Sequence, residues 1–259
     1  MLIASLAVLF IGVSKSGFGG GIGILGTPLF IIIMPGSMAL SVMLPILLTC
    51  DAFTVRQFPK TWHRESFRAL FPWNFTGLFL GLAALVLISR QGLKADLWIR
   101  LVVGLVVFAF PLIAILGKKR STTVAAPPPL WLSAATGLLC GVTTMIAHAA
   151  GVILNLYLLR VKMSPQEFVG TTGRFYLTFN SLKIPFYIAA TFLAHKAFLT
   201  PHNAFYCLWL LPLCPLGVAM GAWLNRRFTT RRFETAVRVL LVVSGAFMSW
   251  DSGARLFRS

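Results

Sequence analysis

The sequence predicts an all-α polytopic membrane protein that forms one transmembrane domain over residues 1–259. Three observations predict this class. Of the 259 residues, 58% are apolar and only 11% are charged, against about 25% charged in an ordinary soluble domain. Windows without a charged residue occur at 16–50, 69–89, 121–159 and 197–225, and each could hold a membrane span of about 20 residues. The 23 Lys and Arg exceed the 6 Asp and Glu by 17, which is typical of a membrane protein whose loops carry the basic residues.

The same composition excludes several other classes. A nucleic-acid-binding protein also has a high pI, but its basic residues form a patch on a soluble fold, so we expect no nucleic acid partner. The sequence contains no HExxH motif, no Ser/His/Asp spacing, no pair of catalytic carboxylates and no dinucleotide fingerprint, so we predict no enzyme activity, no catalytic residue and no cofactor. Its four cysteines form no CxxC pair, so we predict no metal site.

Ten apolar segments follow one another along the chain. Those of the first half cover about 2–14, 20–34, 37–56, 68–89 and 95–117, and those of the second half cover about 130–144, 149–161, 166–194, 203–225 and 234–250. The first two segments of each half are short, which favours short or re-entrant helices over full spans. Non-helical backbone at membrane depth must be surrounded by protein or line a cavity, so we expect the substrate site at these breaks.

The two halves resemble each other, which predicts an internal repeat. GVSKSGFGGGIGILGTPL from Gly12 aligns with GVTTMIAHAAGVILNLYL from Gly141 at an offset of 129 (141 − 12). At the same offset Asp51 falls on Asn180. We predict repeat one over about 1–117, a basic and proline-containing linker at 118–129, and repeat two over about 130–259. Later in each half a glycine pair recurs, formed by Gly77 and Gly81 and by Gly217 and Gly221.

Basic loops indicate how the repeats are oriented. The strongest ones lie at 56–68 in the first half and at 226–232 in the second, and the linker carries three further cations at 118–120. The first two are not equivalent loops of the repeat. If the positive-inside rule places all three in the cytoplasm, the halves have opposite topology. Inverted repeats of this kind are a common architecture of secondary transporters.

The first candidate site is the stretch SKSGFGGG at 14–21. Ser14 supplies a hydroxyl and Lys15 a cation, while Gly19 and Gly20 allow the backbone to turn and present N–H groups at a helix start. Such groups together favour an anion. The alternative is that these glycines serve close helix packing while Lys15 reaches the membrane interface.

The matching stretch of the second half contains Thr143, Thr144 and His148. Two hydroxyls and an imidazole at a helix break can hydrogen-bond an oxyanion, and the imidazole can also carry a proton. The alternative is a structural histidine in an apolar core.

Arg174 lies inside an apolar segment, where an arginine normally faces a cavity, a partner or a ligand. We consider Asp51 and Asn180 as its partners, and Asn180 as a substrate contact beside Arg174. Asp51 and His148 are candidates for proton coupling. The alternatives for Arg174 are a structural pair with Asp51 or a place near the lipid headgroups. Lys183, just before a proline, is either interfacial or cavity-lining.

The motifs GVSKSGFGGGIGILGTPL, GVTTMIAHAAG and FVGTTGRFYLTFNSLKIPFY resemble those of the TauE/SafE family of membrane permeases, often called sulfite exporters. The resemblance extends from Gly12 to about Trp250. It implies a multi-pass transporter of the inner membrane for small anions such as sulfite, sulfoacetate or related organic acids. After His148 the chain reads AAGVIL, where relatives commonly have glycine and proline.

The sequence therefore predicts a secondary anion transporter that works by alternating access in the lipid bilayer. The substrate would lie between the glycine-rich stretch and the Thr143, Thr144 and His148 break, with Arg174 neutralising its charge. One alternative is a permease for a divalent metal or another cation, with Asp51 and His148 as ligands. Another is a membrane scaffold without transport activity. Direction of transport and assembly as a homo-oligomer stay open.

Overall fold

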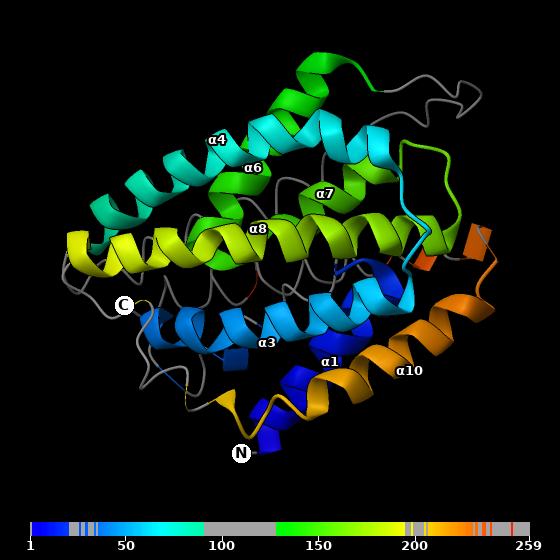
Figure 1. Ribbon diagram of the computed structural model, residues 1–259, viewed down its shortest axis with the longest axis horizontal. Helices are drawn as coiled ribbons and strands as arrows, with labels where there is room; N and C mark the ends of the chain where they lie inside the picture. Colours follow the sequence, from blue (N-terminus) through cyan, green and yellow to red (C-terminus); the bar gives the residue numbers. More distant parts are fainter. Residues whose placement is uncertain are drawn as a thin grey trace.

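The computed structural model describes residues 2–20, 26, 29–30, 34, 36–90, 128–194, 198, 205, 207–229, 231–232, 235–236, 239 and 250. Over these residues the chain forms seven helices and no strand (Figure 1), which confirms the predicted all-α class. Four stretches are long and apolar enough to cross a membrane, namely Met38–Gln57, Arg64–Ser89, Leu130–Ala147 and Pro165–Ala194. The segment predicted at 95–117, and most of those predicted at 20–34 and 234–250 and of the linker, lie outside the described residues.

The first half contributes α1 (Leu2–Phe18), α3 (Gly36–Gln57) and α4 (Arg64–Ser89). The end of α1 corrects the predicted segment 2–14, because the helix continues through Ser14 and Lys15 to Phe18. Gly19 and Gly20 then take φ values of +64° and +77°, in the left-handed region that glycine enters without a Cβ penalty. The Gly20 N–H donates to the Ser14 carbonyl at 2.9 Å and closes the helix end.

The second half contributes α6 (Leu130–Ala147), α7 (Ala150–Leu158), α8 (Pro165–Ala194) and α10 (Leu213–Arg227). At 9 residues, α7 is as short as predicted. By contrast, α6 has 18 residues and is long enough to span, so the prediction that it is short was wrong. The predicted segment 130–144 ends too early, because the helix continues through Met145 and Ile146 to Ala147.

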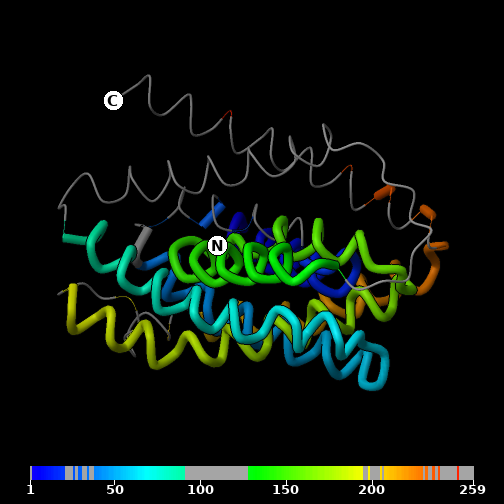
Figure 2. Tube along the Cα trace, turned by 90° about the horizontal axis from the view of Figure 1, so that it is seen from above, coloured from blue at the N-terminus to red at the C-terminus, as the bar shows by residue number. Residues whose placement is uncertain are grey.

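Helices of the first half pack against helices of the second half in two pairs. α4 lies along α6, and α1 lies along α10, while α3 runs beside α8 (Figures 1 and 2). Glycines allow the close approach in both pairs, since a Cβ on Gly141 would lie 2.4 Å from the Asn74 carbonyl oxygen, and one on Gly12 would lie 2.9 Å from the Gly217 Cα. Two of the recurring glycines of each half therefore face each other across the halves, namely Gly77 with Gly141 and Gly12 with Gly217.

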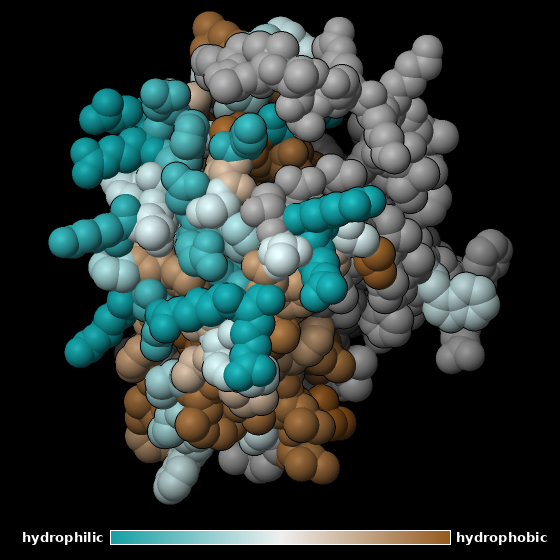
Figure 3. Space-filling model, turned by 90° about the vertical axis from the view of Figure 1, so that its right-hand side faces the viewer, coloured by the Kyte–Doolittle hydropathy of each residue, from teal (hydrophilic) through white to brown (hydrophobic). Residues whose placement is uncertain are grey.

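One end of the molecule gathers the basic side chains. α3 and α10 end there, and α4 and α8 begin there, at the right of Figure 1; Figure 3 looks onto this end and shows its hydrophilic residues. The Arg226 guanidinium reaches the Gln57 side-chain oxygen at 3.3 Å and lies over the Phe58 ring. The loops at 56–68 and 226–232 thus lie at the same end. Its exposed basic residues are Arg56, Lys60, Arg64, Arg68, Arg160, Lys162, Arg226, Arg227, Arg231 and Arg232.

Candidate functional site

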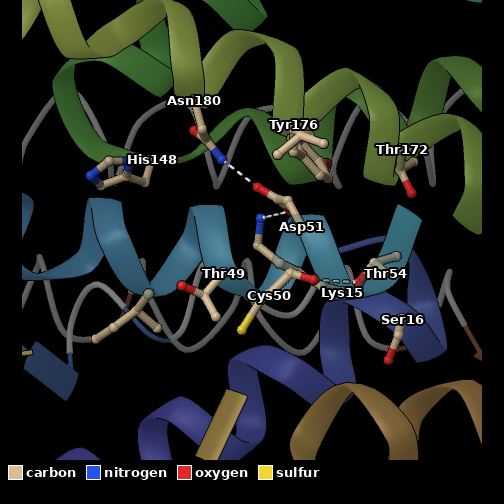
Figure 4. Close-up of polar contacts among 12 residues, drawn as sticks. Lys15, Ser16, Thr49, Cys50, Asp51, Thr54, His148, Thr172, Tyr176 and Asn180 are labelled. Atoms are coloured by element: carbon tan, nitrogen blue, oxygen red, sulfur yellow. Dashed lines mark hydrogen bonds and ion pairs between the residues drawn. The ribbon is translucent and has the colours of Figure 1, made fainter. Parts of the chain in front are cut away.

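Asp51 of α3 is fully buried at the centre of a polar cluster (Figure 4). The Lys15 ammonium on α1 donates to its Oδ1 and forms an ion pair with it. The Asn180 amide on α8 donates to Oδ2 at 2.6 Å. Both carboxylate oxygens therefore have a charged or polar donor, and three helices from both halves meet at one carboxylate.

Lys15 is held inside the protein. It is 5% exposed, and its ammonium lies 4.7 Å from the centroid of the Tyr176 ring, a distance at which a cation is attracted to the ring face. The Tyr176 hydroxyl in turn donates to the Gly19 carbonyl at 3.3 Å. The alternative in which Lys15 reaches the membrane interface does not match these contacts.

A second group of polar contacts surrounds Lys183 of α8, which is fully buried. Its ammonium donates to the Thr144 carbonyl at 3.2 Å and to the Thr144 hydroxyl at 3.1 Å, and it lies 2.7 Å from His148 Nδ1. On the other side of the ring, His148 Nε2 lies 3.2 Å from the Leu40 carbonyl. A carbonyl only accepts and an ammonium only donates, so these partners fit a neutral imidazole with its proton on Nε2.

The backbone explains why His148 reaches this place. It terminates α6 with a φ of +53°, in the left-handed conformation that usually belongs to glycine at a helix end. The Ala149 N–H donates to the Thr143 carbonyl at 3.3 Å. A residue other than glycine in this conformation is strained, and such strain gathers at functional sites. Gly19, which aligns with His148 at the offset of 129 (148 − 19), has the same left-handed backbone.

The two groups form one cluster, which we call the two-lysine cluster. Tyr176, Asn180 and Lys183 lie four and then three residues apart on α8, so they share a face of that helix. Asn180, which lies between the other two on this face, donates to Asp51 and so joins the two groups. The cluster consists of Lys15, Asp51, Thr144, His148, Tyr176, Asn180 and Lys183.

Two other predicted residues are direct chain neighbours of cluster residues, since Ser14 precedes Lys15 and Thr143 precedes Thr144. The Ser14 hydroxyl is buried and has no hydrogen-bond partner among the residues that the structure describes. The Thr143 hydroxyl donates to the Leu139 carbonyl of its own helix at 2.6 Å. Most of the predicted site residues are therefore brought together, with Thr143 turned to its own backbone.

Arg174 lies elsewhere. Its guanidinium donates to the carbonyls of Phe58 at 3.0 Å, Gly170 at 3.2 Å and Pro59, and lies 5.0 Å from the Trp62 ring centroid. These contacts tie α8 to the loop before α4 at the basic end. The pairing of Arg174 with Asp51 or Asn180 was wrong, because Lys15 takes the place at Asp51 that was expected for Arg174.

Two residues of the cluster were not among the predicted site residues. For Lys183 the sequence fits both an interfacial and a cavity-lining position, and Tyr176 is not among the predicted residues. The spacing of Tyr176, Asn180 and Lys183 places all three on one face of a helix. That spacing is readable in the sequence and would have joined Lys183 to Asn180.

Apolar helices of spanning length that enclose buried charged residues define an integral membrane protein. The family model for "Sulfite exporter TauE/SafE" matches residues 4–248. The chain therefore belongs to the TauE/SafE family, which confirms the resemblance found in the sequence and makes it a membrane transport protein. Searches of curated proteins and of solved structures gave no match.

Proposed function

We propose that this protein is a secondary transporter that carries small anions across the inner cell membrane. The observation that carries the proposal is the charge of the two-lysine cluster. Lys15 and Lys183 are buried, and Asp51 is paired with Lys15. In the part of the chain that the structure describes, Lys183 has no carboxylate partner. A buried cation without a counter-ion is costly, and a bound anion supplies the missing charge.

The neighbours of the lysines suit an oxyanion. The Thr144 hydroxyl and the Ser14 hydroxyl, which has no partner among the described residues, can both donate to an anionic oxygen. An arriving anion competes with Asp51 for Lys15 and with Thr144 and His148 for Lys183. Those contacts keep both ammonium groups hydrogen-bonded while no substrate is bound. The cation alternative has less support, because Asp51 and His148 both lie against lysines that would repel a metal ion.

We further propose that the halves are inverted repeats that rock around this cluster. The helix ends support the equivalence of the two halves. α1 ends at Phe18 and α6 at Ala147, which are 129 residues apart (147 − 18). α3 begins at Gly36 and α8 at Pro165, which are also 129 residues apart (165 − 36). α3 ends at the basic end whereas α8 begins there (Figure 1), so the two run in opposite directions. Asp51 and Asn180, equivalent in the repeat, touch each other.

The name of the family supports a sulfur oxyanion as substrate and export as the direction. We propose sulfite or a small organic sulfonate, because the three oxygens on one sulfur can meet both lysines and the nearby hydroxyls together.

Transport assays in proteoliposomes test this function. We expect saturable flux of labelled sulfite or sulfoacetate, with no flux of a divalent cation such as Mn²⁺ under the same gradient. Empty liposomes correct for passive leak. Cation flux alone would favour the metal permease, and the absence of flux for all three solutes would favour the scaffold.

Cysteine labelling tests the inverted topology. In a variant whose four native cysteines are replaced by alanine, Lys60→Cys and Arg231→Cys are expected to react with a membrane-impermeant thiol reagent from the cytoplasmic side only. Both residues are exposed at the basic end. Arg90→Cys, just after the far end of α4, is the control and should react from the opposite side. Labelling of positions 60 and 231 from different sides would contradict the arrangement.

A further inference from the structure

The charge of the two-lysine cluster bears on which anions it accepts. In the arrangement described, Lys15 and Lys183 contribute two positive charges and Asp51 one negative charge, so the sum is +1 with a neutral His148. The stretch at 21–35, which follows the left-handed turn of Gly19 and Gly20, contains no charged residue. A monoanion neutralises this cluster. A dianion leaves an excess negative charge in a buried site, which is costly unless a proton enters with it.

Two groups of the cluster could take that proton, Asp51 and His148. His148 Nδ1 faces the Lys183 ammonium at 2.7 Å and Nε2 faces the Leu40 carbonyl. A proton on Nδ1 would replace an acceptor by a donor and set two cations against each other. Protonation at His148 therefore breaks the contact that holds Lys183.

Protonation of Asp51 has the opposite effect. It ends the ion pair with Lys15 and frees that ammonium for the substrate, while the carbonyl oxygen of the protonated carboxyl still accepts from the Asn180 amide. The charged or titratable groups near Asp51 come from each packed helix: Lys15 from α1, Tyr176 and Lys183 from α8, and Cys214 from α10, which contacts the neighbouring Cys50. The cations among them are the groups that the substrate engages.

We propose that Asp51 is the proton acceptor that lets this site bind a dianion. With Asp51 ionised the cluster takes a monoanion, and with Asp51 protonated it takes a dianion held between Lys15 and Lys183. The exchange balances: one proton and one dianion enter, the ion pair between Lys15 and Asp51 opens, and the charges of two ammonium groups and one dianion sum to zero. Transport of a dianion is then coupled to one proton. This inference rests on the proposed anion transport.

Calorimetry with two ligands of similar size tests it. Sulfoacetate is a dianion and isethionate a monoanion at pH 8, and each is titrated into the purified protein in two buffers that differ in ionisation enthalpy. The difference in heat gives the protons taken up per ligand bound. We expect about one proton for sulfoacetate and about none for isethionate, by linkage between proton and ligand binding. In Asp51→Asn, sulfoacetate should bind without proton uptake.

Glu65→Gln is the matched control, because it removes an exposed carboxylate at the start of α4, and it should leave the proton count unchanged. Sulfoacetate binding without proton uptake in the unmodified protein would overturn the role of Asp51 and leave anion transport standing. Proton uptake that persists in Asp51→Asn would also overturn it. Failure of both ligands to bind would instead contradict the proposed anion site. If Asp51→Asn does not fold, the comparison of the two ligands still decides.

Discussion

Replacing Lys183 with Gln is expected to reduce anion flux by about 30- to 700-fold while the protein still folds. Glutamine keeps an N–H donor for Thr144 and His148 but loses the charge. The loss of a charge-assisted contact to substrate is worth about 2–4 kcal/mol, and each 1.4 kcal/mol is about tenfold. The measurement is initial flux of labelled sulfoacetate in proteoliposomes, normalised to inserted protein. Lys183→Arg, which retains the charge, should recover part of the flux.

The melting temperature of the same variant separates binding from structure. Because Lys183 has no carboxylate partner among the described residues, removing its charge relieves a buried and uncompensated cation. Lys183→Gln should therefore melt at the same temperature as the unmodified protein or higher. A lowered melting temperature with unchanged flux per folded molecule would show that Lys183 is structural and would contradict the proposed site.

Two further variants serve as controls. Lys162→Gln removes an exposed lysine at the basic end and should change neither flux nor melting temperature. Arg174→Gln removes the contacts to the carbonyls of Phe58 and Gly170, so it should lower stability while flux per folded molecule stays within about threefold. Loss of flux in Arg174→Gln with full stability would instead restore the role that the sequence predicted for this residue.

The position of Arg174 shows what the sequence leaves undetermined. An arginine in an apolar stretch looks the same whether it faces a mid-membrane cavity or an adjoining loop. Its partners, Phe58 and Pro59, lie 116 and 115 positions earlier in the chain, and they are backbone carbonyls that any residue would provide. No pattern in the sequence marks such an acceptor, so only the packing of α8 against the loop before α4 reveals it.

Other parts of the site were predictable because the sequence itself carries a signal for them. The repeat at an offset of 129 aligned Asp51 with Asn180, and these two residues touch. Lys15 is predicted as a site residue from its place beside the glycines, whereas its actual partner, Asp51, is predicted as a partner of Arg174. What could not be foreseen is that the helix continues past Ser14 through Lys15 to Phe18. A run of glycine and serine favours a turn, and the packing of α1 against α3 and α10 extends the helix.

Replacing Gly77 with Leu is expected to destabilise the protein by about 3 kcal/mol or more. A Cβ at position 77 would lie 2.5 Å from the Leu138 carbonyl oxygen and 2.9 Å from the Gly141 Cα. Both are backbone atoms, so no side-chain rotation can relieve the clash and α4 must move away from α6. We expect the melting temperature to fall by about 6–12 °C, measured on detergent-purified protein.

Ala83→Leu is the matched control for this prediction, because it adds the same side chain to an exposed position of α4 and should leave the melting temperature within about 2 °C. The contact between α1 and α10 predicts a second effect of the same kind. A Cβ on Gly217 would lie 2.7 Å from the Leu9 carbonyl oxygen, so Gly217→Leu should separate α10 from α1 at a similar cost. A large effect at Gly77 with none at Gly217 would mean that the two contacts are not equivalent, which would remove the packing support for a repeat. Equal effects would indicate that both halves depend on the same glycine contact, as a duplicated unit should.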